Sequence, residues 1–365
     1  GRTDLIPLWV ADMDFATAPF VTDAIRKRCE NEVLGYTGKP DSYYNAIINW
    51  VKQRYDLIVT KEVINFVPGI VPGIGMAMNC FTQKGDKVMI QPPVYHPFAW
   101  VTTRNERTLV INPLKWENGM YRMDLDAFRE QIKGCKLFIL CNPHNPGGVV
   151  WTEAELRAIA DICYDEKVLV FSDEIHADLT LPPHTHRPFA TVSEKARMNS
   201  VTFMSPSKAF NMPGLSASHA LIFNEDLRKR FRIYMDAGEL DMGHVFAFLS
   251  VEAAYSHGTE WLDQCLAYIQ GNIDFVDEFL KKHAPKIKAI RPEASYLVWL
   301  DCRELELSQK DLNEFFVDKA HLALNDGEMF GKEGIGFMRL NVASPRCIIE
   351  KAMKQLADAY QLYIK

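Results

Sequence analysis

The sequence predicts an α/β fold: a large domain built on a mostly parallel, doubly wound sheet, and a smaller α+β domain. Short runs of β-branched and apolar residues alternate with segments of helical character, which is typical of a parallel sheet covered by helices on both faces. A chain of 365 residues is long enough to form more than one domain. The runs expected to form buried strands lie at residues 87–90, 137–141, 168–171, 201–204 and 220–223.

Two of the expected helices have recognisable starts. Thr152 and Glu155 have the spacing of a capping box, which predicts a helix from there to about residue 164. A run rich in proline and glycine leads into a helix-compatible segment at residues 74–81.

After about residue 260 the pattern changes. The elements expected there are a long helix at 261–283, an apolar run at 294–300, a helix around 309–320 and a closing helix from Ile348. We therefore expect a large domain at residues 31–260, and a small α+β domain in which residues 1–30 join residues 261–365.

The composition excludes several classes of protein. A formal net charge of −6 gives no basic surface for nucleic acid or anionic lipid, and no run is long and apolar enough to cross a bilayer. The eight cysteines are dispersed without a Cys-x-x-Cys pair, which fits reduced thiols in a cytoplasmic protein better than a disulfide framework. The chain starts at Gly1 without a signal-peptide segment, and we expect a trimmed N-terminus.

Lys208 is the most informative single residue. It follows the strand predicted at 201–204, and two hydroxyl residues, Ser205 and Ser207, precede it. A lysine that is desolvated near other cations can lose its proton and form a Schiff base. Hydroxyls and a backbone turn beside it can hold an anion, so the combination suggests pyridoxal 5′-phosphate (PLP).

Two other predicted strands also end in polar residues. Asp173 follows the strand at 168–171, and Asn145 lies in an Asn-, Pro- and Gly-rich segment after the strand at 137–141. Ligands of doubly wound sheets bind beyond the carboxyl ends of the strands, so we expect Asn145, Asp173 and Lys208 to meet in one crevice. Each alone has a simpler interpretation as a helix cap or a turn, but their order favours a binding site.

A phosphate group needs free backbone N–H groups, which helix N-termini supply. The residues just before the helix predicted at 74–81 are Gly69, Ile70 and Val71. We expect their amides to bind the phosphate, although a Pro/Gly turn would be the preferred interpretation without the other motifs.

Together these motifs resemble those of the fold-type I PLP-dependent enzymes, the aspartate aminotransferase superfamily. The resemblance is carried by residues 142–147, 172–176 and 205–208 and extends over nearly the whole chain. Within the superfamily, residues 7–15, the pair Gly35-Tyr36 and residues 337–341 are most similar to the cystathionine β-lyase, or C–S lyase, branch. The resemblance implies a seven-stranded sheet in the large domain and PLP as the cofactor.

The resemblance also implies contacts to the cofactor ring. Asp173 pairs with the ring nitrogen, because a buried carboxylate favours the protonated form of that nitrogen. Asn145 donates to the ring hydroxyl, and His176 lies close enough to contribute. Tyr95, after the strand at 87–90, stacks on the ring and takes part in acid–base steps, whereas an aromatic in this place is otherwise more often a packing residue.

Further contacts are implied for the phosphate and the substrate. Ser205 adds its hydroxyl to the phosphate site, with Ser207 beside it. Tyr36 reaches the phosphate of a neighbouring subunit, which implies a homodimer with composite active sites. Arg339 binds the substrate α-carboxylate, since a guanidinium matches a carboxylate with two hydrogen bonds.

One position departs from the pattern of many aminotransferases, and it favours the lyase branch. Ser216 stands where those enzymes have an arginine that binds the phosphate. We therefore expect a β-lyase that cleaves S-substituted L-cysteines such as L-cystathionine to a thiol (homocysteine for cystathionine), pyruvate and ammonia. Lys208 is expected to be the base, with Tyr95 as a second catalytic residue.

Two alternatives stay open, and a metal site is disfavoured. The same residues serve an aminotransferase, because partition between elimination and transamination depends on barriers that differ by a few kcal/mol. A PLP-binding regulatory module is disfavoured, since we expect no DNA-binding extension and the sequence has no basic stripe. His176, His184 and His186 have the residue type of metal ligands, but PLP chemistry needs no metal and we expect none.

Overall fold

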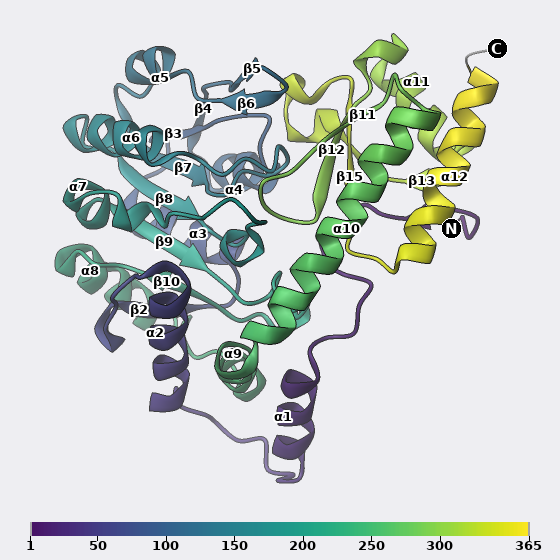
Figure 1. Ribbon diagram of the computed structural model, residues 1–365. Helices are drawn as coiled ribbons and strands as arrows, with labels where there is room; N and C mark the ends of the chain where they lie inside the picture. Colours follow the sequence, from purple (N-terminus) through teal and green to yellow (C-terminus); the bar gives the residue numbers. More distant parts are fainter. Residues whose placement is uncertain (1, 364–365) are drawn as a thin grey trace.

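The computed structural model describes residues 2–363 and confirms the α/β fold. The main sheet has seven strands in the order β2-β10-β9-β8-β7-β3-β4 (Figure 1). Neighbouring strands are parallel except around β10, which runs antiparallel to β2 and β9. The strands are β2 (Ile64–Val67), β3 (Lys87–Ile90), β4 (Thr108–Ile111), β7 (Cys135–Cys141), β8 (Leu169–Asp173), β9 (Ser200–Met204) and β10 (Ser218–Leu221).

The predicted strands lie where the sequence indicated, with one shift. β10 begins and ends two residues before the run predicted at 220–223. Its ends follow the backbone pairing, because Ser218 is opposite Val67 and Leu221 is opposite Ile64. Hydrophobicity alone does not reveal this antiparallel register.

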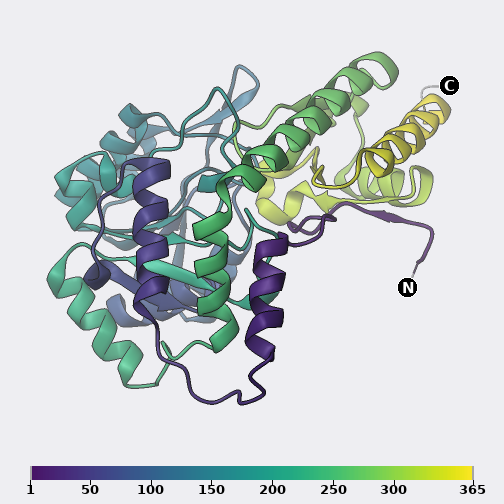
Figure 2. The same cartoon turned by 60° about the horizontal axis from the view of Figure 1, so that its bottom comes forward.

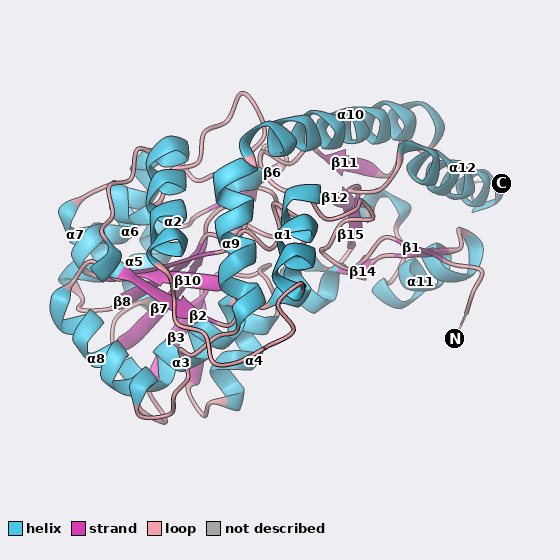
Figure 3. Cartoon of the chain, turned by 90° about the horizontal axis from the view of Figure 1, so that it is seen from below, coloured by secondary structure: helices cyan, strands magenta, loops and turns pink. Residues whose placement is uncertain are grey.

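Helices cover both faces of the sheet (Figure 3). One face packs against α3 (Ile70–Phe81), α4 (Pro97–Arg104) and α8 (Glu225–Asp236), and the other packs against α5 (Leu125–Gln131) and α6 (Glu153–Asp165). Within β8, Val170 packs in the core under α5 and α6, and Phe171 packs in the core under α3, α4 and α8, as the alternation of side chains along a strand requires. The short helix α7 (Glu194–Met198) contacts α6.

The capping box predicted at Thr152 is present. Glu155 donates its backbone N–H to Oγ1 of Thr152 at 3.2 Å, and the Glu155 carboxylate accepts the Thr152 N–H at 2.8 Å. The helix predicted from residue 74 begins earlier, at Ile70, with Gly69 as its N-cap. The residues expected to hold a phosphate are therefore the first turn of α3 itself.

Three further helices pack together beside the sheet. They are α1 (Pro19–Cys29), α2 (Asp41–Tyr55) and α9 (Val245–His257), and α9 lies between the other two (Figure 2). Trp50 of α2 stacks on Tyr255 of α9 with ring centroids 4.9 Å apart. This group encloses one end of the largest hydrophobic core.

A second sheet lies in the C-terminal part of the chain. Its four strands are antiparallel, in the order β11 (Lys288–Ile290), β12 (Leu297–Asp301), β15 (Phe337–Asn341) and β14 (Asn325–Asp326). The N-terminal strand β1 (Ile6–Pro7) pairs in parallel with β13 (Leu322–Ala323). The domain boundaries proposed at residues 30 and 260 stay a prediction.

The remaining elements complete the chain. A hairpin of β5 (Lys115–Glu117) and β6 (Met120–Arg122) turns at Asn118 and Gly119, which both have positive φ. The helices of the C-terminal part are α10 (Thr259–His283), α11 (Gln309–Glu314) and α12 (Arg346–Tyr363), and α11 continues as a π-helical turn at Phe315–Lys319. Within residues 2–363 no helix combines the length and apolar character needed to span a membrane.

Candidate active site

Most of the residues singled out from the sequence gather around one cavity beyond the carboxyl ends of β7, β8 and β9. Its volume is about 220 Å³. Predicted site residues that line it are Gly69, Ile70, Val71, Tyr95, Asn145, Asp173, His176, Ser207 and Lys208. Ser216 also lines it, at the position where many aminotransferases have an arginine. Asn145, Asp173 and Lys208, predicted at the ends of three strands, thus line one cavity.

Lys208 follows β9 and directs its amine toward the N-terminal segment. Its Nζ donates a hydrogen bond to the backbone carbonyl of Ala11, which also lines the cavity. Burial lowers the pKa of the lysine, and the nearby positive charge of Arg339 lowers it further. These two effects favour the neutral amine, which is the nucleophilic form.

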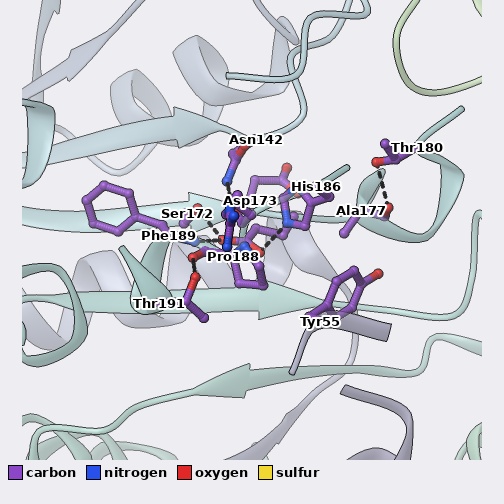
Figure 4. Close-up of polar contacts among 12 residues, drawn as sticks. Tyr55, Asn142, Ser172, Asp173, Ala177, Thr180, His186, Pro188, Phe189 and Thr191 are labelled. Carbon is purple, nitrogen blue, oxygen red and sulfur yellow. Dashed lines mark hydrogen bonds and ion pairs between the residues drawn. The ribbon is translucent and has the colours of Figure 1, made fainter. Parts of the chain in front are cut away.

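Asp173 is the last residue of β8 and is buried (Figure 4). Burial raises the pKa of its carboxyl to about 7, although the Ile175 N–H donates to Oδ1 at 3.1 Å and opposes the shift. A carboxyl group of this kind ionises readily when a cation comes to face it. Asp173 can therefore hold a protonated ring nitrogen.

Arg339 extends from β15 of the second sheet to Asn145, which lines the cavity, but Arg339 is not itself a lining residue. Nη1 donates to Oδ1 of Asn145 at 3.0 Å, while Nη2 donates to the carbonyl of Trp9 at 3.0 Å and to Oδ1 of Asn325 at 2.6 Å. Burial lowers the pKa of the guanidinium to about 10, so it stays charged at neutral pH. With its oxygen used by Arg339, Asn145 presents its NH₂ group to a ligand.

The first turn of α3 borders the cavity with unused backbone donors. The Gly73 N–H is the first to bond within the helix, reaching the Gly69 carbonyl at 2.9 Å, and Pro72 has no N–H. The N–H groups of Ile70 and Val71 precede this first intrahelical bond, and such groups at a helix N-terminus bind anions. This arrangement fits a phosphate group.

Ser205 lies below the cavity surface rather than on it. Its Oγ donates to the Ala217 carbonyl at 2.8 Å and accepts the Ser207 N–H at 3.1 Å. In this geometry the hydroxyl holds together the loop that carries Lys208. The predicted contact between Ser205 and a phosphate stays a prediction.

Tyr95 and His176 lie at the cavity, but Tyr36 does not. Burial raises the pKa of the Tyr95 phenol and lowers the pKa of His176 to about 3, so both are neutral at physiological pH. Tyr36 is 98% exposed in a segment between α1 and α2 and is absent from the cavity lining. One chain alone therefore does not bring Tyr36 to the site.

Sequence reasoning missed the polar contacts that fix the segment at residues 9–15 over the cavity. Asn341 donates to the carbonyls of Val10 and Asp12, both at 2.6 Å, and the Tyr296 hydroxyl donates to the Ala11 carbonyl at 3.0 Å. In addition, Asn211 bonds to the backbone of this segment at three points. The partners lie far apart in the sequence, and no short-range pattern reveals them.

The histidines considered as metal ligands form other contacts. Nε2 of His186 lies 2.8 Å from Oε2 of Glu174, and Nδ1 of His184 lies 3.7 Å from Oε1 of Glu293. In the part of the chain that the structure describes, no group of three or more His, Cys, Asp or Glu side chains is arranged to hold a metal ion.

Fold and cavity together define the class of protein, a doubly wound α/β enzyme with a desolvated lysine at the sheet edge. The chain belongs to the aminotransferase class I and II family, whose sequence profile matches residues 3–356.

Individual relatives match along nearly their whole length. The chain is 38% identical over 361 residues to cystathionine β-lyase PatB of Bacillus subtilis, covering 98% of this chain and 93% of the relative. PLP-containing cystalysin of Treponema denticola superposes with a TM-score of 0.96 at 34% identity, over 100% of this chain and 93% of that chain. For the PLP-bound C–S lyase of Staphylococcus hominis the TM-score is 0.91 at 35% identity, with coverage of 98% and 92%.

Proposed function

We propose that this protein is a PLP-dependent C–S β-lyase that acts on S-substituted L-cysteines such as L-cystathionine. The observation that carries the proposal is the arrangement of Lys208, Asp173 and the first turn of α3 around one cavity. An amine, a ring-nitrogen partner and a phosphate site are the three groups that PLP requires. The similarity to cystathionine β-lyase PatB and to two PLP-containing structures supports the same conclusion.

When bound, PLP attaches covalently to an amine and withdraws electrons from the bonds at the substrate α-carbon. The protein's own groups direct this chemistry. Asp173 would keep the ring nitrogen protonated, Asn145 would donate its NH₂ group to the ring hydroxyl, and the Ile70 and Val71 N–H groups would bind the phosphate. Tyr95 would exclude water from the ring.

The substrate is held and deprotonated by two residues. Arg339 binds the α-carboxylate; its Nε has no hydrogen-bond partner among residues 2–363 and supplies one of the donors. Lys208 would act as the base that removes the α-proton. The thiolate then leaves the β-carbon, and hydrolysis of the remaining three-carbon fragment yields pyruvate and ammonia, so that one water molecule is consumed.

The test of this function is Lys208→Ala. The variant is expected to form no pyruvate from cystathionine, measured with lactate dehydrogenase and NADH, and to lose the long-wavelength absorbance of the lysine-bound cofactor. Lys133→Ala is the control. Lys133 is an exposed lysine that pairs with Glu130 on the surface, and the variant is expected to behave as wild type. Wild type that turns over amino acids only with a 2-oxo acid partner would instead identify an aminotransferase.

We also propose that the active protein is a homodimer in the cytoplasm. The exposed segment at residues 31–40 carries Tyr36 together with the exposed apolar residues Val33 and Leu34, which suits a contact between subunits. Tyr36 would then donate to the phosphate bound by the other subunit. All eight cysteines are free thiols, which supports a reducing compartment.

A further inference from the structure

Behind Asp173 lies a buried polar cluster that the proposed chemistry does not use. Its centre is Glu174, whose side chain is fully buried and is not part of the cavity lining. Oε1 accepts hydrogen bonds from the Ser172 hydroxyl and from the Phe189 N–H, both at 2.8 Å, and Oε2 lies 2.8 Å from Nε2 of His186. Figure 4 shows Ser172, His186 and Phe189 close to Asp173.

The contacts of Glu174 are those of a carboxylate when His186 carries its proton on Nε2. The backbone N–H of Phe189 can only donate, and the Ser172 hydroxyl donates to the same oxygen. A proton on Nδ1 of His186 would be buried without an acceptor among residues 2–363, which favours the proton on Nε2, facing Oε2. In this arrangement both carboxylate oxygens accept, and Glu174 carries a negative charge inside the protein.

His186 leaves that charge uncompensated. Its Nδ1 is buried without a hydrogen-bond partner among residues 2–363, so an imidazolium would bury an N–H with no acceptor. The neutral tautomer, with the proton on Nε2, satisfies Glu174 without this cost. The pair then has a net charge of −1.

The other groups around the pair do not supply a direct counter-charge. The Tyr55 ring packs edge-on against His186 with centroids 5.5 Å apart. The Tyr55 hydroxyl and Trp50 Nε1 both donate to the next buried carboxyl, Asp178. Arg54 lies over Trp50 and pairs with Asp263, and Arg187, which follows His186 in the chain, directs Nε toward Glu153.

We propose that Glu174 is a positioning residue for the cofactor: its buried charge, held by Ser172, Phe189 and His186, keeps a proton on the ring nitrogen that Asp173 faces. The inference rests on the proposed PLP site. Asp173 and Glu174 are adjacent at the end of β8, and low-dielectric surroundings transmit the field of one to the other. Burial and then the charge of Glu174 raise the pKa of Asp173, whereas Lys208 acts in the opposite direction.

The test uses the PLP-loaded protein with nitrogen-15 in the cofactor ring, because the chemical shift of that nitrogen reports its protonation directly. Glu174→Gln removes the charge and keeps nearly the same shape. The midpoint of the ring-nitrogen titration is expected to fall by about one pH unit, as for the loss of one nearby charge at an intermediate dielectric. A midpoint equal to that of wild type would overturn the proposal.

Two controls separate charge from packing. Ser172→Ala removes a hydrogen bond to Glu174 but no charge, and His186→Gln keeps a neutral donor; both are expected to leave the midpoint unchanged. A rise of the midpoint in His186→Gln would mean that the native histidine is charged, and would refute the inference even if Glu174→Gln does not fold. Absence of PLP binding by wild type would instead refute the proposed function.

Discussion

Nη1 of Arg339 donates a hydrogen bond to Oδ1 of Asn145 across 3.0 Å, and this bond connects the four-stranded sheet to the loop that follows β7 of the seven-stranded sheet. Arg339 belongs to β15, whereas Asn145 follows β7 of the seven-stranded sheet. The bond fixes which end of the Asn145 amide faces the cavity. The residue proposed to bind substrate thus also orients a residue proposed to bind the cofactor.

Arg339→Lys is expected to lower kcat/KM for cystathionine by about 100-fold or more, since an ammonium cannot replace two charge-assisted hydrogen bonds of a planar guanidinium. The kinetics of pyruvate release measure this. Arg346→Lys is the matched control, because Arg346 contacts Asn272 away from the cavity. Equal losses in both variants would contradict a specific role for Arg339.

Asp173→Asn is expected to change how the stability of the cofactor-free protein depends on pH. Folding raises the carboxyl pKa from 3.8 to about 7, so between these pH values the folded state binds a proton that the unfolded state does not. The free energy of unfolding therefore falls as the pH rises toward 7. Between pH 5 and pH 8, wild type should lose roughly 2–3 kcal/mol of unfolding free energy relative to Asp173→Asn. Urea denaturation of both proteins at the two pH values measures the difference, and parallel pH profiles would exclude a raised pKa.

Tyr36→Phe is expected to weaken PLP retention by about 10-fold or more, the effect of losing a hydrogen bond to a charged group. Loss of PLP should also loosen the dimer, because a ligand bound only by the assembled form stabilises it. The PLP dissociation constant is measured at matched protein concentration, with the half-exposed Tyr164→Phe as control. A fully active monomer in sedimentation would rule out the composite site.

Gly73→Ala is expected to reduce both stability and PLP retention. A Cβ at this position would lie 2.9 Å from Cγ2 of Val67 and 3.2 Å from the Phe203 ring, so the start of α3 must move away from the sheet. Such overpacking costs about 1–3 kcal/mol, and it displaces the Ile70 and Val71 amides. Thermal unfolding and PLP titration measure the two effects.

Gly75→Ala is the control for this helix. Its Cβ would face Val101 at 3.3 Å, away from the sheet. The variant should change stability by less than about 1 kcal/mol, because alanine favours helix over glycine, and should bind PLP as wild type does. Loss of PLP in both variants would mean that helix α3 as a whole, rather than its first turn, is sensitive.

The sequence predicted the parts of the site that depend on local order. Asp173 ends one buried strand and Lys208 follows another, and a doubly wound sheet brings the carboxyl ends of its strands to one edge. The position of Gly69–Val71 at the start of a helix follows similarly from the proline- and glycine-rich run around them. These positions need only the alternation of strands and helices.

Other features of the site depend on tertiary contacts that no local pattern encodes. Ser205 is predicted to contact a phosphate through its hydroxyl. Its position close to Lys208 in the sequence cannot indicate that this hydroxyl donates to the Ala217 carbonyl. Likewise, the environment of Glu174 requires His186 and Phe189 to return to the end of β8. Such contacts are decided by how loops pack over the sheet.

The Ala11 carbonyl, a main-chain group, accepts hydrogen bonds from both the Lys208 amine and the Tyr296 hydroxyl. No exchange of the side chain at position 11 removes this acceptor, so a saturation library there would report tolerance at a point of direct contact with the reactive amine. Replacement of the following amide bond by an ester weakens the carbonyl as an acceptor and leaves every side chain in place. Protein semisynthesis, rather than codon-based mutagenesis, is therefore the route to this contact.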